Sequence, residues 1–338
     1  MRRPAARTTT VLAGALLLLA TGCSADGGDG GEDLQTITAA TAAVSPAVSN
    51  QPAGAVVPVG QPVGAAAFDA ETGTVVLLTD DATHLLLYPA GDVAAPPRDV
   101  PLPGGVAALS APHAGTVVVP AGRSVVRVNL ANGETSTVDV DGEVRSATLL
   151  DDGGMVVGTE DGTVLELDAD GAQTAKVTGF ASVDALGVTG DQVTALDREQ
   201  TSVSNVLLDK GQIGMALRAG EGATNLATDH FGRILVTDTT GGELIALTTD
   251  PLMMRQRYPV PNSPYAVTVD ESTNLVWVTV TGTNEVIGYD LASGIPIEKH
   301  RYPTVRQPNA VAVDSKTGTL FVASGTGDGL QRIETAGQ

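Results

Sequence analysis

The sequence predicts an all-β fold, a β-propeller of seven four-stranded blades. The first observation is a repeat with a period of about 41 residues, which spans almost everything after residue 53. The second is that each copy contains four short apolar runs rich in Val, Leu and Ala, as the four strands of one blade require. The third is the absence of any ten-residue run with helical periodicity, which excludes helical solenoids of similar period.

The chain begins with a segment typical of protein export. Three arginines within the first seven residues precede an apolar run over residues 11–20, which fits a signal peptide and is too short to span a bilayer. The run ends in Leu19-Ala-Thr-Gly-Cys23, which resembles a bacterial lipobox with the preferred leucine one position early. This resemblance implies that residues 1–22 are a lipoprotein signal peptide, removed before acylation of Cys23. The alternative is an ordinary signal peptide. Because Cys23 is the only cysteine, no intramolecular disulfide can form.

Residues 23–52 are predicted to be the lipidated cysteine and a flexible tether. The segment from Ser24 to Gln51 is rich in Gly, Asp, Ser, Thr and Ala. It shows neither strand nor helix periodicity, as expected of a linker.

Residues 53–338 are predicted to form the propeller, because seven copies of the repeat follow one another there. The copies begin at these positions: Val63, Val106, Val144, Val183, Thr224, Pro264 and Pro308. The last copy supplies three strands and stops near Glu334. We expect the run Ala53–Val59 to add its missing outer strand and so close the ring, with Pro58 tolerated at a sheet edge.

The two C-terminal copies, over residues 263–334, show a recognisable motif. Residues 276–294 read Val-Trp-Val-Thr-Val-Thr-Gly-Thr-Asn-Glu-Val-Ile-Gly-Tyr-Asp-Leu-Ala-Ser-Gly, which resembles the YVTN-type propeller repeat. The Gly-His and Trp-Asp marks of WD40 repeats are absent from the sequence. Together with the lipobox, the chain resembles actinobacterial envelope lipoproteins of the YncE-like propeller type. That resemblance implies a binding or scaffold module more often than an enzyme.

The charge balance restricts the possible partners. Asp and Glu number 39 against 19 Lys and Arg, a formal net charge of −20. Nucleic-acid binding needs clustered basic residues, so we expect no nucleic-acid partner. An anionic membrane would repel the protein, and membrane association must therefore come from the lipid on Cys23.

Familiar catalytic and metal-binding motifs are not recognisable in the sequence. The four histidines lack metal-ligand spacing, and no Gly-x-Ser-x-Gly elbow occurs. Asp139-Val-Asp-Gly142 and Asp168-Ala-Asp-Gly171 fit hairpin turns better than calcium loops. No helix follows the glycine-rich loop 325–329, so it is predicted to connect strands and not to bind phosphate. We expect no metal, no cofactor and no enzymatic activity.

One set of residues predicts a ligand site in the central channel. The residue after each copy's first position lies where the innermost strands begin, and five of these seven residues are polar. In chain order the seven are Gly64, Ala107, Arg145, Asp184, Asn225, Tyr265 and Asn309. We expect the five polar side chains to converge at one mouth of the channel, with Arg145 and Asp184 pairing across adjacent blades.

Two alternative roles for this polar ring remain open. The side chains could line a water-filled channel and satisfy backbone groups of the inner strands. Alternatively, Asp184, Asn225 and Asn309 resemble part of the cation ligands of lactonase-type propellers, which implies a metal-dependent hydrolase. Against the hydrolase, the ring lacks the glutamate of those ligand sets, and Arg145 would oppose a cation.

The sequence therefore predicts a lipid-anchored protein on the extracytoplasmic face of the cell membrane. Its propeller would bind an envelope protein or a small polar ligand without catalysis. The alternative is a lactonase-like or other hydrolase that uses the central channel.

Overall fold

The computed structural model describes residues 34–335. The predicted signal peptide and Cys23 lie outside the described residues. The chain divides into Met1–Leu34 and Gln35–Gln338, and the second unit contains the fold. None of its described helices is long and apolar enough to cross a membrane.

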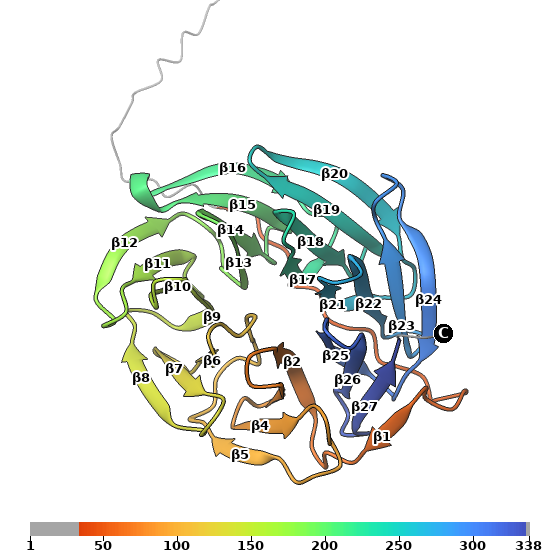
Figure 1. Cartoon of the computed structure of the whole chain (residues 1–338). Coiled ribbons are helices and arrows are strands. Elements are labelled where there is room, and N and C mark those ends of the chain that lie inside the picture. Colours follow the sequence, from red (N-terminus) through yellow and green to blue (C-terminus); the bar gives the residue numbers. More distant parts are fainter. Residues whose placement is uncertain (1–33, 336–338) are drawn as a thin grey trace, which may run out of the picture. The chain divides into compact units, whose positions relative to one another are not determined.

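The unit Gln35–Gln338 is a seven-bladed β-propeller, as the repeat predicts (Figure 1). Seven antiparallel sheets are arranged around a central channel, six with four strands and one with three. The only described helix is a single 3-10 turn, η1 (Leu208–Lys210).

Each blade runs from an innermost strand at the channel to an outermost strand at the rim. Blade one contains β2 (Val63–Asp69), β3 (Thr74–Thr79), β4 (His84–Pro89) and β5 (Arg98–Pro101). Blade two contains β6 (Thr116–Pro120), β7 (Ser124–Asn129) and β8 (Thr135–Asp139). Blade three contains β9 (Val144–Leu149), β10 (Met155–Thr159), β11 (Thr163–Leu167) and β12 (Gln173–Thr178). Blade four contains β13 (Ala185–Thr189), β14 (Gln192–Asp197), β15 (Ser202–Leu207) and β16 (Gln212–Arg218).

The remaining blades follow the same pattern. Blade five contains β17 (Ala223–Thr228), β18 (Arg233–Asp238), β19 (Glu243–Thr249) and β20 (Leu252–Pro259). Blade six contains β21 (Pro264–Asp270), β22 (Leu275–Val280), β23 (Glu285–Asp290) and β24 (Ile297–Pro303). Blade seven contains β25 (Pro308–Asp314), β26 (Thr319–Ser324), β27 (Leu330–Glu334) and β1 (Ala55–Val57).

Blade two differs from the prediction in its innermost strand. The second copy of the repeat predicts a strand from Val106, but residues 102–112 are in no strand of the structure. Pro103 and Pro112 lack the backbone N–H that a strand ladder needs, and Gly104 has a positive φ of 93°. The segment nevertheless lines the channel through residues 108–113.

The N-terminal strand closes the ring, and the prediction of this closure is confirmed. Strand β1 pairs antiparallel with β27, with Val56 opposite Gln331. The Gln331 side chain is fully buried and donates to the carbonyl oxygen of Ala53 at 2.7 Å. The first and last described strands therefore share one sheet.

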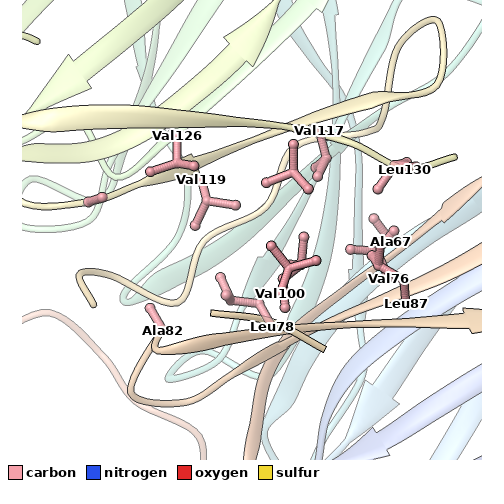
Figure 2. Close-up of a cluster of buried hydrophobic side chains, with 13 residues drawn as sticks. Ala67, Val76, Leu78, Ala82, Leu87, Val100, Val117, Val119, Val126 and Leu130 are labelled. Atoms are coloured by element: carbon pink, nitrogen blue, oxygen red, sulfur yellow. The ribbon is translucent and has the colours of Figure 1, made fainter. Parts of the chain in front are cut away.

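The hydrophobic core is divided into seven clusters, one between each pair of neighbouring blades. Figure 2 shows the cluster between blades one and two, where Val117 and Val119 of β6 face Val76 and Leu78 of β3. Alternating apolar residues on both faces of each blade produce such clusters, because each sheet is buried on both sides. The clusters contain eight to thirteen buried residues, and the smallest lies between blades three and four.

Residues 35–52, which we call the strap, correct the prediction of a flexible tether over residues 23–52. The strap lies against the propeller and crosses from blade four to blade seven before entering β1. The Ile37 amide donates to the Glu199 carbonyl at 2.8 Å, and the Ala43 amide donates to Ser263 Oγ at 3.0 Å. Ser45 is buried, and its hydroxyl donates to the Thr281 carbonyl at 2.6 Å. Backbone groups make most of these bonds, so the strap leaves no periodic pattern in the sequence.

Candidate functional site

The two faces of the propeller differ in what covers them. The loops that precede the inner strands and follow the second strands lie on one face, and the strap contacts only these loops. We call it the strap face. The turns that follow the inner strands lie on the opposite face, where the central cavity opens, and we call this the cavity face.

The five polar residues predicted to form a ring all occur where inner strands begin, on the strap face. Arg145, Asn225, Tyr265 and Asn309 lie within β9, β17, β21 and β25, and Asp184 directly precedes β13. All five are partly exposed. Whether they bind a ligand remains a prediction.

Several of these side chains bond to neighbouring parts of the propeller. Asn225 Nδ2 donates to the Tyr265 carbonyl of the next inner strand at 3.1 Å. The Asp184 carboxylate accepts from the Arg198 amide at 2.9 Å and from the Ser182 hydroxyl. These contacts are of the kind expected if the ring satisfies backbone groups.

The expected pair between Arg145 and Asp184 does not form. Arg145 instead forms an ion pair with Glu160 of its own blade, at 2.9 Å. Glu160 follows the second strand and lies on the same face, so it reaches the guanidinium without crossing to the next blade. The sequence reasoning compared only the inner positions and therefore missed this carboxylate.

The strap also reaches the ring. Gln307 Nε2 donates both to the Ala43 carbonyl of the strap and to Asn309 Oδ1, each at 3.0 Å. Gln307 Oε1 also accepts a hydrogen bond from the Ser45 amide at 2.9 Å. Part of the predicted ring is therefore connected directly to the strap.

The central channel is a cavity with a volume of about 1430 Å³. Its wall consists mainly of short side chains on the inner strands, such as Ala66, Ala147, Ala185 and Ala312. Asp184 is the one residue of the predicted ring that lines it.

The cavity is not symmetric around the channel. From blades one, two, five, six and seven, only the innermost segments and the turns after them contribute to its lining. Between blades three and four it extends outward to Thr174 of the outermost strand β12 and to Asp209 of η1. We call this side branch the crevice. Its floor contains Leu150, Val188 and Leu208, which pack against the smallest interblade cluster and are only partly buried.

The part of the cavity formed by blades three and four is acidic. Its lining contains no Lys, Arg or His and six acidic residues: Asp151, Asp152, Glu166, Asp184, Asp191 and Asp209. Within residues 34–335, no hydrogen bond or ion pair involves the carboxylate of Asp191 or Asp209. Across the cavity, the Nδ1 atom of His113 in blade two lies 3.9 Å from Asp151 Oδ1.

Sequence reasoning did not find the crevice. Asp151 and Asp191 occupy equivalent turns after inner strands, so aligning these turns across copies would have shown acidic residues in neighbouring blades. Asp209 lies in a turn before an outermost strand, and only the folded blades bring it to the same cavity. In the described residues 34–335, no three His, Cys, Asp or Glu side chains are placed to hold a metal ion.

Comparison with known proteins supports the propeller fold. No protein-family model and no curated protein sequence matches the chain. A chain of hydrazine synthase from Kuenenia stuttgartiensis is similar in structure, with a TM-score of 0.70 and 13% identity over 83% of this chain and 98% of that chain. A structure of streptogramin B lyase gives a TM-score of 0.66 and 13% identity over 83% and 96% of the two chains.

A similar propeller also occurs in a protein that is not named as an enzyme. The Cps50 (Swd1) β-propeller domain of Myceliophteria thermophila gives a TM-score of 0.69 and 12% identity, covering 86% of this chain and 99% of that one. The similar structures thus include two chains that are named as enzymes and one that is named only as a β-propeller domain. At these identities the likeness shows the fold alone.

Proposed function

We propose that the protein is a lipid-anchored YncE-like propeller of the extracytoplasmic membrane face, which binds an envelope molecule without catalysis. The observation that carries this proposal is the placement of strap and cavity on opposite faces. The chain enters the propeller on the strap face, and the cavity of about 1430 Å³ opens on the other.

The predicted anchor and the strap together favour this arrangement. Residues 24–34 separate Cys23 from the strap, and even a fully extended chain of that length reaches only about 40 Å. An acyl group on Cys23 would hold the blade-four end of the strap near the bilayer. The cavity face then stays accessible to molecules in the envelope.

The contacts of the polar ring disfavour metal-dependent catalysis at the strap face. Asp184 and Asn225 are engaged by backbone groups, and Arg145 is paired with Glu160. A divalent cation at this ring would have to compete for the Asp184 carboxylate with the Arg198 amide and the Ser182 hydroxyl, and the Arg145 guanidinium would repel it. Metal analysis of the purified protein tests this alternative, because a stoichiometric, tightly bound divalent cation would favour the hydrolase.

The anchor is tested with Cys23→Ser and the adjacent substitution Ser24→Ala as its control. Cells are labelled with a clickable fatty acid and then fractionated. We expect Cys23→Ser to lose the label and to be released from membranes or kept as uncleaved precursor, whereas Ser24→Ala behaves like the original chain. A mature, membrane-bound Cys23→Ser protein would contradict the lipoprotein assignment.

A further inference from the structure

The crevice between blades three and four has the features of an interaction surface. It is the only interblade space in the described chain into which the central cavity extends as far as an outermost strand. Leu150, Val188 and Leu208 leave aliphatic surface exposed there, although each packs against a buried cluster. Incompletely covered aliphatic surface inside a concave site favours binding of an apolar group.

The charge of the crevice selects the kind of partner. The carboxylates of Asp191 and Asp209 are exposed and have no partner among the described residues, and Asp151 has only His113 at 3.9 Å. Lys210 is next to Asp209 in the chain but does not line the cavity. A cationic partner would supply the missing counter-charges, and the net charge of −20 would speed its approach.

The size and shape favour a polypeptide over a small cation. The volume of about 1430 Å³ is that of the central channel together with the crevice, and it exceeds the volume of about 300–1,000 Å³ that is common for small-molecule pockets. The crevice also continues from the channel to the outer strand β12, so its length suits an extended chain. An aliphatic floor beside acidic side chains matches a segment that carries both apolar and basic side chains.

We propose that the crevice binds a linear segment of a partner protein that carries Lys or Arg together with aliphatic side chains. This inference rests on the proposed function, because it assigns the partner class of the same binding module. Basic side chains of the segment bond to Asp191 and Asp209, and its aliphatic side chains pack on Val188 and Leu208.

The test uses the full chain and a short fluorescent peptide in which lysine and leucine alternate, with fluorescence anisotropy as the readout. The variant Asp191→Asn/Asp209→Asn removes two charges and keeps the shape of the rim. The control Asp80→Asn/Glu143→Gln removes the same charge from exposed carboxylates on the strap face, which also have no partner among residues 34–335. Val188→Thr makes the floor polar at nearly constant volume.

We expect the crevice variant to weaken peptide binding about tenfold and the control to change it less than about twofold. Val188→Thr should weaken it about threefold, and a glutamate–leucine peptide should not bind. Equal losses in the crevice variant and the control would overturn the proposal, because the attraction would then be non-specific. No binding to the original chain would also overturn it.

A third outcome concerns the class of ligand. If arginine amide binds as tightly as the peptide, the site is a small-cation pocket and the assignment of a polypeptide partner is wrong. If the peptide does not bind, the lipid anchor can still be present, because acylation of Cys23 is measured independently by fatty-acid labelling. Failure of the labelling test, conversely, does not change the peptide affinity.

Discussion

Closure of the ring by β1 can be tested at a single glycine. Gly54 has a φ of +68°, and a Cβ atom at this position would lie 2.1 Å from the carbonyl oxygen of Arg332 in β27. Backbone cannot yield to such a contact, so Gly54→Ala must move β1 away from β27. Gly60 provides a matched control, because its φ is +80° and nothing lies within 4 Å of an added Cβ.

The expected loss follows from the contacts of β1. Val57 and Val59 are partly buried against the core between blades seven and one, and each contributes about 1 kcal/mol. The pairing of Ala55–Val57 with β27 adds about 1–3 kcal/mol of net hydrogen-bond free energy. Gly54→Ala should therefore lower the free energy of unfolding by about 3–5 kcal/mol, against about 1 kcal/mol for the strain in Gly60→Ala.

Urea denaturation followed by tryptophan fluorescence measures this difference. Trp277 is the only tryptophan and lies fully buried between blades six and seven, beside the closing blade. The melting temperature of Gly54→Ala should fall by about 6–12 °C. If the two alanine variants unfold at the same urea concentration, then pairing of β1 with β27 does not stabilise the ring.

Three further predictions concern the strap, one surface turn and one blade core. Ser45→Ala removes a buried hydroxyl that bonds backbone groups of blades six and seven, and should speed hydrogen exchange in the strap about tenfold or more without shifting global unfolding. Hydrogen bonds from threonine hydroxyls, that of Thr79 foremost, lower the pKa of Asp81 to about 2 from 3.8. The stabilisation from these hydrogen bonds is present above about pH 4 and is lost as the pH falls towards 2. Thr79→Val removes one of the hydroxyl donors, so the pKa of Asp81 measured by NMR titration should rise. Gly288→Ala places a Cβ 2.8 Å from the buried ring of Trp277. Denaturant unfolding should show a free energy of unfolding lower by about 1–3 kcal/mol, and the fluorescence emission of Trp277 should shift.

The fold could be predicted because the same burial pattern recurs in every copy of the repeat. A run such as Leu275–Val280 is buried at every position, as a strand between two neighbouring blades must be. Counting strands was enough to assign Ala55–Val57 to the last blade, since Leu330–Glu334 would otherwise be an unpaired edge. The prediction of an inner strand from Val106 in blade two was wrong, because Pro103 and Pro112 lack the backbone N–H groups that a strand needs.

The strap could not be predicted from composition. Its residues resemble a linker because few of its side chains are buried, and Ser45 is the single one that is buried by the propeller. Partners of the strap, such as Ser263 and Gln307, lie more than 200 residues away in the chain. Only the folded ring brings these groups together.

The polar ring and the crevice show the limit of reasoning from repeat positions. Such reasoning identifies residues at one mouth of the channel, and it placed Arg145 and Asp184 in neighbouring blades. It does not say which carboxylate forms the ion pair with the Arg145 guanidinium.

The crevice depends on the space that the side chains of two neighbouring blades leave between them. The cluster between blades three and four has eight buried residues and leaves Val188 and Leu208 partly exposed. The strap contacts the propeller from blade four to blade seven, on the opposite face, so in the described chain it leaves this gap uncovered. In the described chain, the interblade space that the cavity enters therefore coincides with the carboxylates that have no partner, and the proposed partner segment binds on the cavity face for this reason.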